Sequence, residues 1–420
     1  MQKMLYFCTL FMCMMQMENY AITIMFVAIG FGFLDLLTDP WPIVQRQLFP
    51  IVTFVLYFLC IITYYYGPDI LTYAPHYETI GTVQDVWRHG SNNTFEIGYS
   101  LFCSALHNMG LSYWWMTWTI KTLYFVAIWL LLRGLPKRQI LALSCVVMTD
   151  INMILHETRQ CLAVSFFIFV ILLMQHRKYL WATLCAILAV SMHKSGFVPV
   201  GLALCGILIY RTRQYAAVYT LLTIVLLFLI ALPVQRISTS LLQLIPLPDA
   251  YIHSLSHHLS IGLQFQTVAV IYLALLMIFG MYLSYDNTRK FTWIAVMALC
   301  GMTVIVLLYP YYFLLVRLRS YFVPFIVYYL VVLLSDEQRT RAVPYGQMIK
   351  QALMLLVLVY YIHVGCSQER GAKLLHSPVY RASTVFELRN ASAQQIHNRQ
   401  MKVAYEYWQK DYMQRAKSSL

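Results

Sequence analysis

The feature that most constrains this chain is a series of long apolar stretches separated by short polar segments. Hydrophobic residues make up 60% of the 420 residues and charged residues only 11%, which excludes an ordinary soluble globular protein. Backbone polar groups in lipid must be satisfied within the chain, and these stretches are too continuous for alternating β-strands. The sequence therefore predicts an all-α, polytopic integral membrane protein with about 12–13 transmembrane helices. The predicted spans are 3–16, 19–36, 48–66, 113–132, 138–155, 161–175, 179–192, 196–210, 214–232, 264–284, 291–309, 311–334 and 349–364.

The basic residues of the short loops all fall on one side when these spans alternate across the membrane. That side is predicted to be cytoplasmic, because Lys and Arg concentrate in short cytoplasmic loops. Topology and anionic lipid thus account for the net charge of +13, and no nucleic-acid partner is expected. The loop residues are Arg46, Arg133, Lys137, Arg138, Arg177, Lys178, Arg211, Arg213, Arg289, Lys290, Arg339, Arg341 and Lys350.

Four regions follow from this topology. Residues 1–66 form N-terminal transmembrane helices, and the Met-rich start is expected to be retained because it lacks a signal-peptide pattern. Residues 67–112 form an outer loop, in which Phe102, Leu106 and Met109 have the spacing of a short surface-lying helix. Residues 113–364 form the transmembrane core, which includes an outer loop at 233–262. Residues 365–420 form a basic C-terminal tail that is expected on the outer side.

A short apolar hairpin within the core brings two polar clusters to the outer side. The runs 161–175 and 179–192 are each only about 22 Å long as helices, against a hydrocarbon core of about 30 Å. Arg159 and His193 should therefore lie below the membrane surface, where an ionisable group is a candidate functional residue. The structural alternatives are that Arg159 anchors a helix end, that Ser195 caps the following helix and that Glu96 only begins a helix.

Other polar residues in the apolar runs also need partners. Arg317 and Arg319 lie inside the 311–334 run and must meet anions or carbonyl groups. Lys121, alone in its span, is expected to pair with a carboxylate or to extend to the membrane surface. Cysteines occur singly and the loop histidines of 253–258 have no acidic residue nearby, so no metal site and no cofactor are predicted.

Several Arg and Lys groups in a shallow outer cavity suit a phosphorylated ligand, because guanidinium groups match phosphate oxygens. A lipid diphosphate fits, since its tail lies in the bilayer while its head enters the cavity. Glycosyl transfer from such a donor needs a stabilised leaving diphosphate and a base for the acceptor hydroxyl. The candidates for the first role are Arg159, Lys194, Arg317 and Arg319. The candidates for the second are Glu96 and His193.

Four motifs carry a resemblance to a known family. They are Gly67-Pro68-Asp69 with Tyr73, Glu96-Ile97-Gly98-Tyr99, Arg159-Gln160 and His193-Lys194-Ser195. Over roughly residues 60–330 the chain resembles the EpsG family, among the Wzy-type polysaccharide polymerases of bacterial inner membranes.

The resemblance implies polymerisation of undecaprenyl-diphosphate-linked repeat units on the periplasmic face, into capsule, exopolysaccharide or O-antigen. It implies a fold like the GT-C membrane glycosyltransferases, without a nucleotide-sugar donor. The expected partners are the lipid-linked oligosaccharide, the growing chain and membrane lipid, with a chain-length regulator and a flippase as candidate protein partners. On this view Glu96, His193 and Arg159 are catalytic, and the substrate is bound by Arg159, Lys194, Arg317, Arg319, Gln160, Ser195, Asp69 and Tyr99.

The chain departs from the family pattern at His156-Glu157, so Glu157 competes with Glu96 for the role of base. Two other functions stay open. A glycosyltransferase that uses a lipid-phosphate sugar would place catalysis on Asp69 and Glu78. A flippase for the lipid-linked unit would use the basic cavity as a path, although the two comparable halves typical of transporters are not evident.

Overall fold

The computed structural model describes most of the apolar helices and the first outer loop. The described residues are 20–38, 42–65, 69–89, 95–211, 292–308, 312–335, 351–360 and 383–384. The predicted spans 3–16, 214–232 and 264–284, the 233–262 loop and nearly all of the tail lie outside them. The chain divides into two compact units: 1–166 with 191–194 and 330–420, and 167–190 with 195–329.

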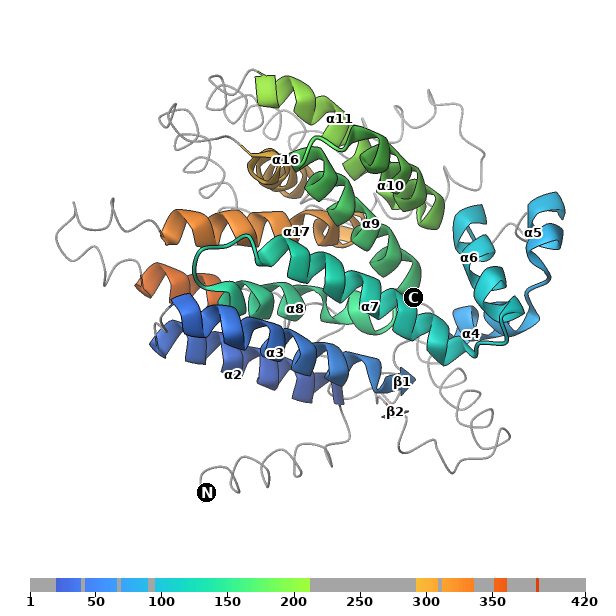
Figure 1. Cartoon of the computed structure of the whole chain (residues 1–420), viewed down its shortest axis with the longest axis horizontal. Coiled ribbons are helices and arrows are strands. Elements are labelled where there is room, and N and C mark those ends of the chain that lie inside the picture. The colour runs from blue at the N-terminus through green and yellow to red at the C-terminus, as the bar shows by residue number, and fades with distance from the viewer. Residues whose placement is uncertain are drawn as a thin grey trace, which may run out of the picture. The chain divides into compact units, whose positions relative to one another are not determined.

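The first unit is built around α8 (Gln139–Leu155), in which every residue is buried. Helices α2 (Tyr20–Thr38), α3 (Pro42–Ile61) and α7 (Tyr113–Leu132) pack against it, as Figure 1 shows. A helix that is apolar on all sides is expected at the centre of a bundle. The α8 sequence, with twelve aliphatic or sulfur-containing residues among its 17, has this character.

The end of α3 differs from the prediction. The helix begins at Pro42 and ends at Ile61, whereas a span over 48–66 was predicted. Residues Thr63–Tyr65 form strand β1, which pairs antiparallel with β2 (Ser383–Thr384). Lys121 Nζ donates to the carbonyls of Cys60 (2.8 Å) and Thr63 (3.2 Å). The expectation that Lys121 pairs with a carboxylate or extends to the surface was therefore wrong, because Lys121 is buried and donates instead to a carbonyl left unsatisfied at the end of α3 and to one in β1.

Three short helices lie in the loop that was predicted on the outer side: α4 (Ile70–Thr79), α5 (Val83–His89) and α6 (Ile97–Asn108). The Ser104 hydroxyl donates to the Gly81 carbonyl at 2.6 Å and fixes α6 to the α4–α5 connection. The helix predicted from Phe102, Leu106 and Met109 is present, but its buried side consists of other residues, namely Gly98, Tyr99, Ser100, Cys103 and Ser104.

The second unit contains the end of α9 (Thr158–Gln175), most of α10 (Tyr179–Met192), α11 (Phe197–Arg211), α16 (Trp293–Leu308) and most of α17 (Tyr312–Leu334). Helix α11 packs against α16. The Phe167 ring of α9 makes edge contacts with Tyr321, Phe322 and Phe325 of α17. These aromatic side chains are fully buried and form the centre of this unit.

Apart from α3, the described helices agree in position with the predicted spans. Helices α7 and α10 begin and end at the predicted residues, while α9 begins three residues earlier than predicted, so that Arg159 lies in its first turn. Four of the described helices are long and apolar enough to cross a membrane, within α3, α7, α9 and α17. Six shorter apolar helices accompany them, including Gln351–Tyr360. The chain is an all-α, polytopic membrane protein, as predicted.

Candidate functional site

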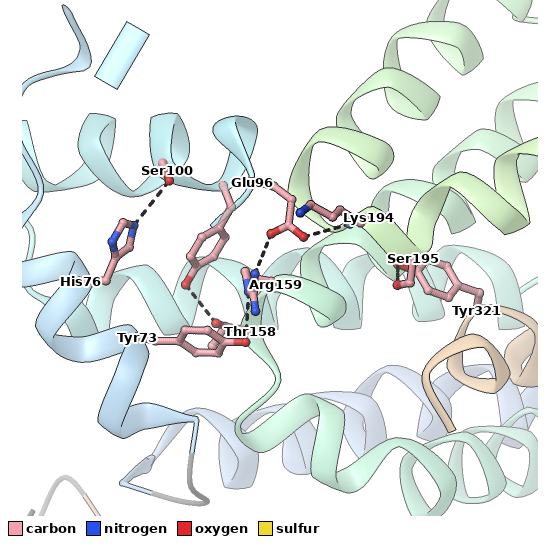
Figure 2. Close-up of polar contacts among 10 residues, drawn as sticks. Tyr73, His76, Glu96, Ser100, Thr158, Arg159, Lys194, Ser195 and Tyr321 are labelled. Carbon is pink, nitrogen blue, oxygen red and sulfur yellow. Dashed lines mark hydrogen bonds and ion pairs between the residues drawn. The ribbon is translucent and has the colours of Figure 1, made fainter. Parts of the chain in front are cut away.

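The candidate site lies in the first unit, where the outer loop meets the first turn of α9 (Figure 2). Helix α8 ends at Leu155, and His156 leaves the helical conformation with φ −137°. The Thr158 N–H bonds to the His156 carbonyl at 3.0 Å, and α9 begins there. This tight connection places Arg159 directly beside the outer loop.

Arg159 is held by an acid and by aromatic rings. Its Nη1 donates to Glu96 Oε2 at 2.7 Å, and its Nε donates to the Tyr73 hydroxyl at 3.1 Å. Its guanidinium carbon also lies 5.2 Å from the Tyr73 ring centroid and 4.8 Å from that of Phe95, both within cation–π range. The side chains of Arg159 and Glu96 are 20% and 10% exposed, so the pair is largely withdrawn from water without being sealed off.

The Glu96 carboxylate is bound on both oxygens. While Oε2 faces Arg159, Oε1 accepts the backbone N–H of Lys194 at 3.1 Å, as Figure 2 shows. Glu96 does stand at the start of α6, but its side chain makes no capping hydrogen bond. Burial raises the pKa of this carboxyl, but Arg159, the Lys194 N–H and His193 lower it by more, so its pKa lies below its ordinary value. Glu96 is therefore ionised at neutral pH.

The Glu-x-Gly-Tyr motif has a steric and a polar basis. A Cβ at position 98 would lie 2.8 Å from the Ser191 carbonyl oxygen, so only glycine lets α6 approach the last turn of α10 this closely. The next residue, Tyr99, is fully buried, and its hydroxyl shares a hydrogen bond with the Thr158 hydroxyl at 3.0 Å. Glu96 and Tyr99 thus connect the start of α6 to the first turn of α9.

His76 lies beside this cluster. Its ring centroid is 4.1 Å from that of Phe95, and its Nε2 lies 3.5 Å from the Ser100 hydroxyl. Burial, and secondly the Arg159 charge, lower the pKa of His76, so the imidazole is neutral at pH 7.

An acid–imidazole pair lies at the end of α8. Asp69 Oδ2 is 3.5 Å from His156 Nδ1, and the His156 side chain is fully buried while that of Asp69 is one-third exposed. This pair connects the start of α4 to the α8–α9 connection. The neighbouring Glu157 is half-buried and adds its charge to the surroundings of Tyr73.

The structure brings together only part of the predicted site. In the first unit it places Glu96, Arg159 and Tyr99 in one cluster, with His193 close enough to lower the pKa of Glu96. Lys194 contributes its backbone while its side chain is exposed, and Gln160 is buried in α9.

The other predicted residues lie in the second unit. The Ser195 hydroxyl shares a hydrogen bond with the Tyr321 hydroxyl at 3.0 Å. On α17, Arg317 is exposed and Arg319 is half-buried. The buried Nε of Arg319 has no hydrogen-bond partner among the described residues.

Four residues of the cluster were not among the predicted site residues: Tyr73, His76, Phe95 and Thr158. Tyr73 belongs to one of the motifs and was the easiest to find. Phe95 and Thr158 directly precede two assigned residues, but nothing in the sequence indicates that they face the cluster. Among the described residues, no group of three or more His, Cys, Asp or Glu side chains could hold a metal ion.

Comparison with known proteins gives one positive result. The model of the EpsG family matches residues 48–370, a range that includes every residue of the cluster described above. No curated protein and no solved structure matches the chain.

Proposed function

The chain belongs to the EpsG family of Wzy-type polysaccharide polymerases, and we propose that it joins undecaprenyl-diphosphate-linked oligosaccharide repeat units on the outer face of a bacterial inner membrane. The reaction is glycosyl transfer from a lipid diphosphate to a sugar hydroxyl. The product is capsule, exopolysaccharide or O-antigen polysaccharide.

One observation carries this proposal: Arg159 is a largely buried cation, held by Glu96 and Tyr73, at the end of a membrane-spanning helix. A charge at this depth is costly to maintain and is retained where it has a task. A guanidinium group is suited to a diphosphate, whose oxygens it binds through paired N–H donors.

The topology supports an outer-face reaction. The predicted cytoplasmic residues Arg133, Lys137 and Arg138 precede α8, whereas Arg159 follows it. Helix α8 has 17 residues and is about 25 Å long, so the predicted topology puts Arg159 near the opposite membrane surface. The outer loop that supplies Glu96 and Tyr73 lies on this same side.

The chemistry requires two groups. The acceptor hydroxyl oxygen forms a bond to the anomeric carbon, and the bond between that carbon and the diphosphate oxygen breaks. Undecaprenyl diphosphate leaves with the electron pair, and the hydroxyl proton passes to a base. We assign charge stabilisation to Arg159 and the role of base to Glu96 or His193. Lys194, Arg317, Arg319, Gln160, Ser195, Tyr99 and Asp69 are proposed to position the substrates.

The proposal is tested in a strain that carries only an Arg159→Ala variant, after its level in the membrane has been measured. We expect surface polysaccharide to lose its long chains while single repeat units still reach the outer face. The matched control is Arg133→Ala, which removes an exposed arginine that stacks on Trp129 at the other end of the bundle. Accumulation of lipid-linked units on the cytoplasmic face would instead indicate a flippase, and unchanged chains would make Arg159 a helix anchor.

The proposed partners follow from this activity. They are the lipid-linked oligosaccharide, the growing chain and the surrounding lipid, with a chain-length regulator and a flippase as protein partners.

A further inference from the structure

Arg159 has two kinds of partner, and they differ in charge. Glu96 is an anion and contacts Nη1, whereas Tyr73 is a neutral phenol whose hydroxyl accepts a hydrogen bond from Nε and whose ring lies near the guanidinium. A diphosphate carries more negative charge than a carboxylate and competes for the same donors. The Glu96 carboxylate repels the diphosphate, whereas the neutral Tyr73 hydroxyl does not. Glu96 is therefore the partner that the diphosphate replaces.

We infer that the Arg159–Glu96 ion pair is the resting form of the site, that a bound lipid diphosphate takes the place of Glu96 on Arg159, and that Tyr73 holds the guanidinium in position during this exchange. The inference rests on the proposed function, since it requires a diphosphate ligand. It assigns Tyr73 as a positioning residue and makes the state of Glu96 depend on the donor.

The exchange changes the strength of Glu96 as a base. The groups that face Glu96 are Arg159 on α9, His193 after α10 and the Lys194 N–H. Arg159 is the strongest of those that keep the carboxyl ionised, while burial favours its protonated form. When Arg159 turns to the diphosphate, the pKa of Glu96 rises and the carboxylate becomes a better acceptor for the hydroxyl proton. The base is thus activated only when the donor is present.

Tyr73 can hold Arg159 because it stays neutral. Burial and the nearby Asp69 raise the pKa of Tyr73, so its hydroxyl remains protonated over the physiological range. Its ring also packs against the rings of Phe95 and Tyr99, at centroid distances of 5.6 and 5.9 Å. A neutral phenol does not repel an incoming anion, and this packing keeps the Tyr73 ring beside the guanidinium.

The test is direct titration of Glu96 by solid-state ¹³C NMR of the full chain in lipid nanodiscs. Carboxyl-labelled glutamate gives eight side-chain signals, and the signal missing from a Glu96→Gln variant identifies Glu96. We expect saturating undecaprenyl diphosphate to raise the pKa of Glu96 by about one pH unit or more. In an Arg159→Ala variant the pKa should be high without ligand and should no longer respond.

The failure of the inference is distinct from the failure of the proposed function. Saturable binding of undecaprenyl diphosphate with no rise in the pKa of Glu96 would overturn the exchange and leave the polymerase proposal intact. An absence of saturable binding would overturn the polymerase proposal and the exchange with it.

The role of Tyr73 is tested by Tyr73→Phe, which removes the hydroxyl and keeps the ring. We expect the maximal rate of polymerisation in membrane vesicles to fall about tenfold, with a smaller change in the substrate concentration for half-maximal rate. The control is Tyr77→Phe, one turn along α4, whose hydroxyl donates to the Leu111 carbonyl at 2.7 Å and does not contact Arg159. An unchanged maximal rate in Tyr73→Phe, or an equal loss in Tyr77→Phe, would remove Tyr73 from the proposed exchange.

Discussion

Two arginine–carboxylate pairs stand near opposite ends of α8 and differ in almost everything except their chemistry. Arg138, directly before α8, lies 3.9 Å from Asp35, and these side chains are 3% and 0% exposed. Arg159, four residues after α8, lies 2.7 Å from Glu96, and these side chains are 20% and 10% exposed. The first pair is closed to any ligand, whereas the second is not.

The Arg138 pair is completed by the chain itself. Asp35 Oδ1 accepts Gln45 Nε2 at 2.7 Å, and Oδ2 accepts the Leu141 N–H at 2.8 Å in the first turn of α8. The Arg138 guanidinium also donates to the Asp35 carbonyl, and the Arg138 N–H donates to Gln45 at 3.0 Å. A carboxylate at a helix N-terminus is favourably placed. This cluster joins α2, α3 and α8.

The Arg159 pair instead joins the outer loop to α9, and its other contacts are a phenol, two aromatic rings and one backbone N–H. An arginine within an apolar chain is therefore not by itself a functional signal. Whether its charge can bind a ligand depends on its exposure to solvent and on whether the chain already satisfies it with other partners.

The largest expected effect is on stability, from Asp35→Asn. This change leaves the buried Arg138 cation without its carboxylate, which costs about 3–5 kcal/mol. The variant should be depleted from the membrane fraction and should lose its fold at a lower temperature in detergent. Wild-type thermal stability of this variant would contradict a structural role for the Asp35 pair.

Glu96→Gln is the corresponding change at the other pair, and its expected effect is on activity. The rate of polymerisation should fall roughly 100-fold, because a positioned base is lost. The melting temperature should fall less than in Asp35→Asn, because the Arg159 and Glu96 side chains are 20% and 10% exposed and Arg159 keeps its hydrogen bond to Tyr73. The control is the exposed Glu78→Gln on α4. Normal polymerisation in Glu96→Gln would leave His193 as the candidate base.

A smaller effect is expected from Gly98→Ala, which pushes α6 away from the Ser191 carbonyl and so displaces Glu96. We expect about a tenfold loss of polymerisation through misplacement of the carboxylate. The matched control is Gly30→Ala on α2, where an added Cβ meets no atom within 4 Å. Equal activity of both variants would show that the position of α6 is not critical.

The smallest effect is expected from Asp69→Asn. Asp69 is one-third exposed and faces His156 at 3.5 Å, so its replacement should change the polymerisation rate by less than about threefold. The chain-length distribution of the surface polysaccharide measures this directly. Complete loss of activity, with Arg159→Ala tolerated, would favour the glycosyltransferase that uses a lipid-phosphate sugar.

Several residues of the site were predicted from the sequence, but the sequence did not show that they lie in one cluster. Glu96, Tyr99 and Arg159 stand in motifs, but the sequence left Glu96, Glu157 and His193 as competing bases. We prefer Glu96 to Glu157 as the proposed base because Glu96 makes an ion pair with Arg159 at 2.7 Å, whereas Glu157 is half-buried near Tyr73. Which acid reaches an arginine 63 residues away depends on packing, not on local pattern.

The sequence by itself determined the membrane architecture and the positions of most helices, as α7 and α10 show. Hydropathy suffices for this because, in lipid, each segment satisfies its own backbone by forming a helix. Only the tertiary structure decided the polar partners: Lys121 with the carbonyls at the end of α3, Asp35 with Arg138, and Glu96 with Arg159. A buried polar side chain bonds to a partner that the neighbouring helices bring within about 3 Å. The local sequence pattern does not specify which helices are neighbours.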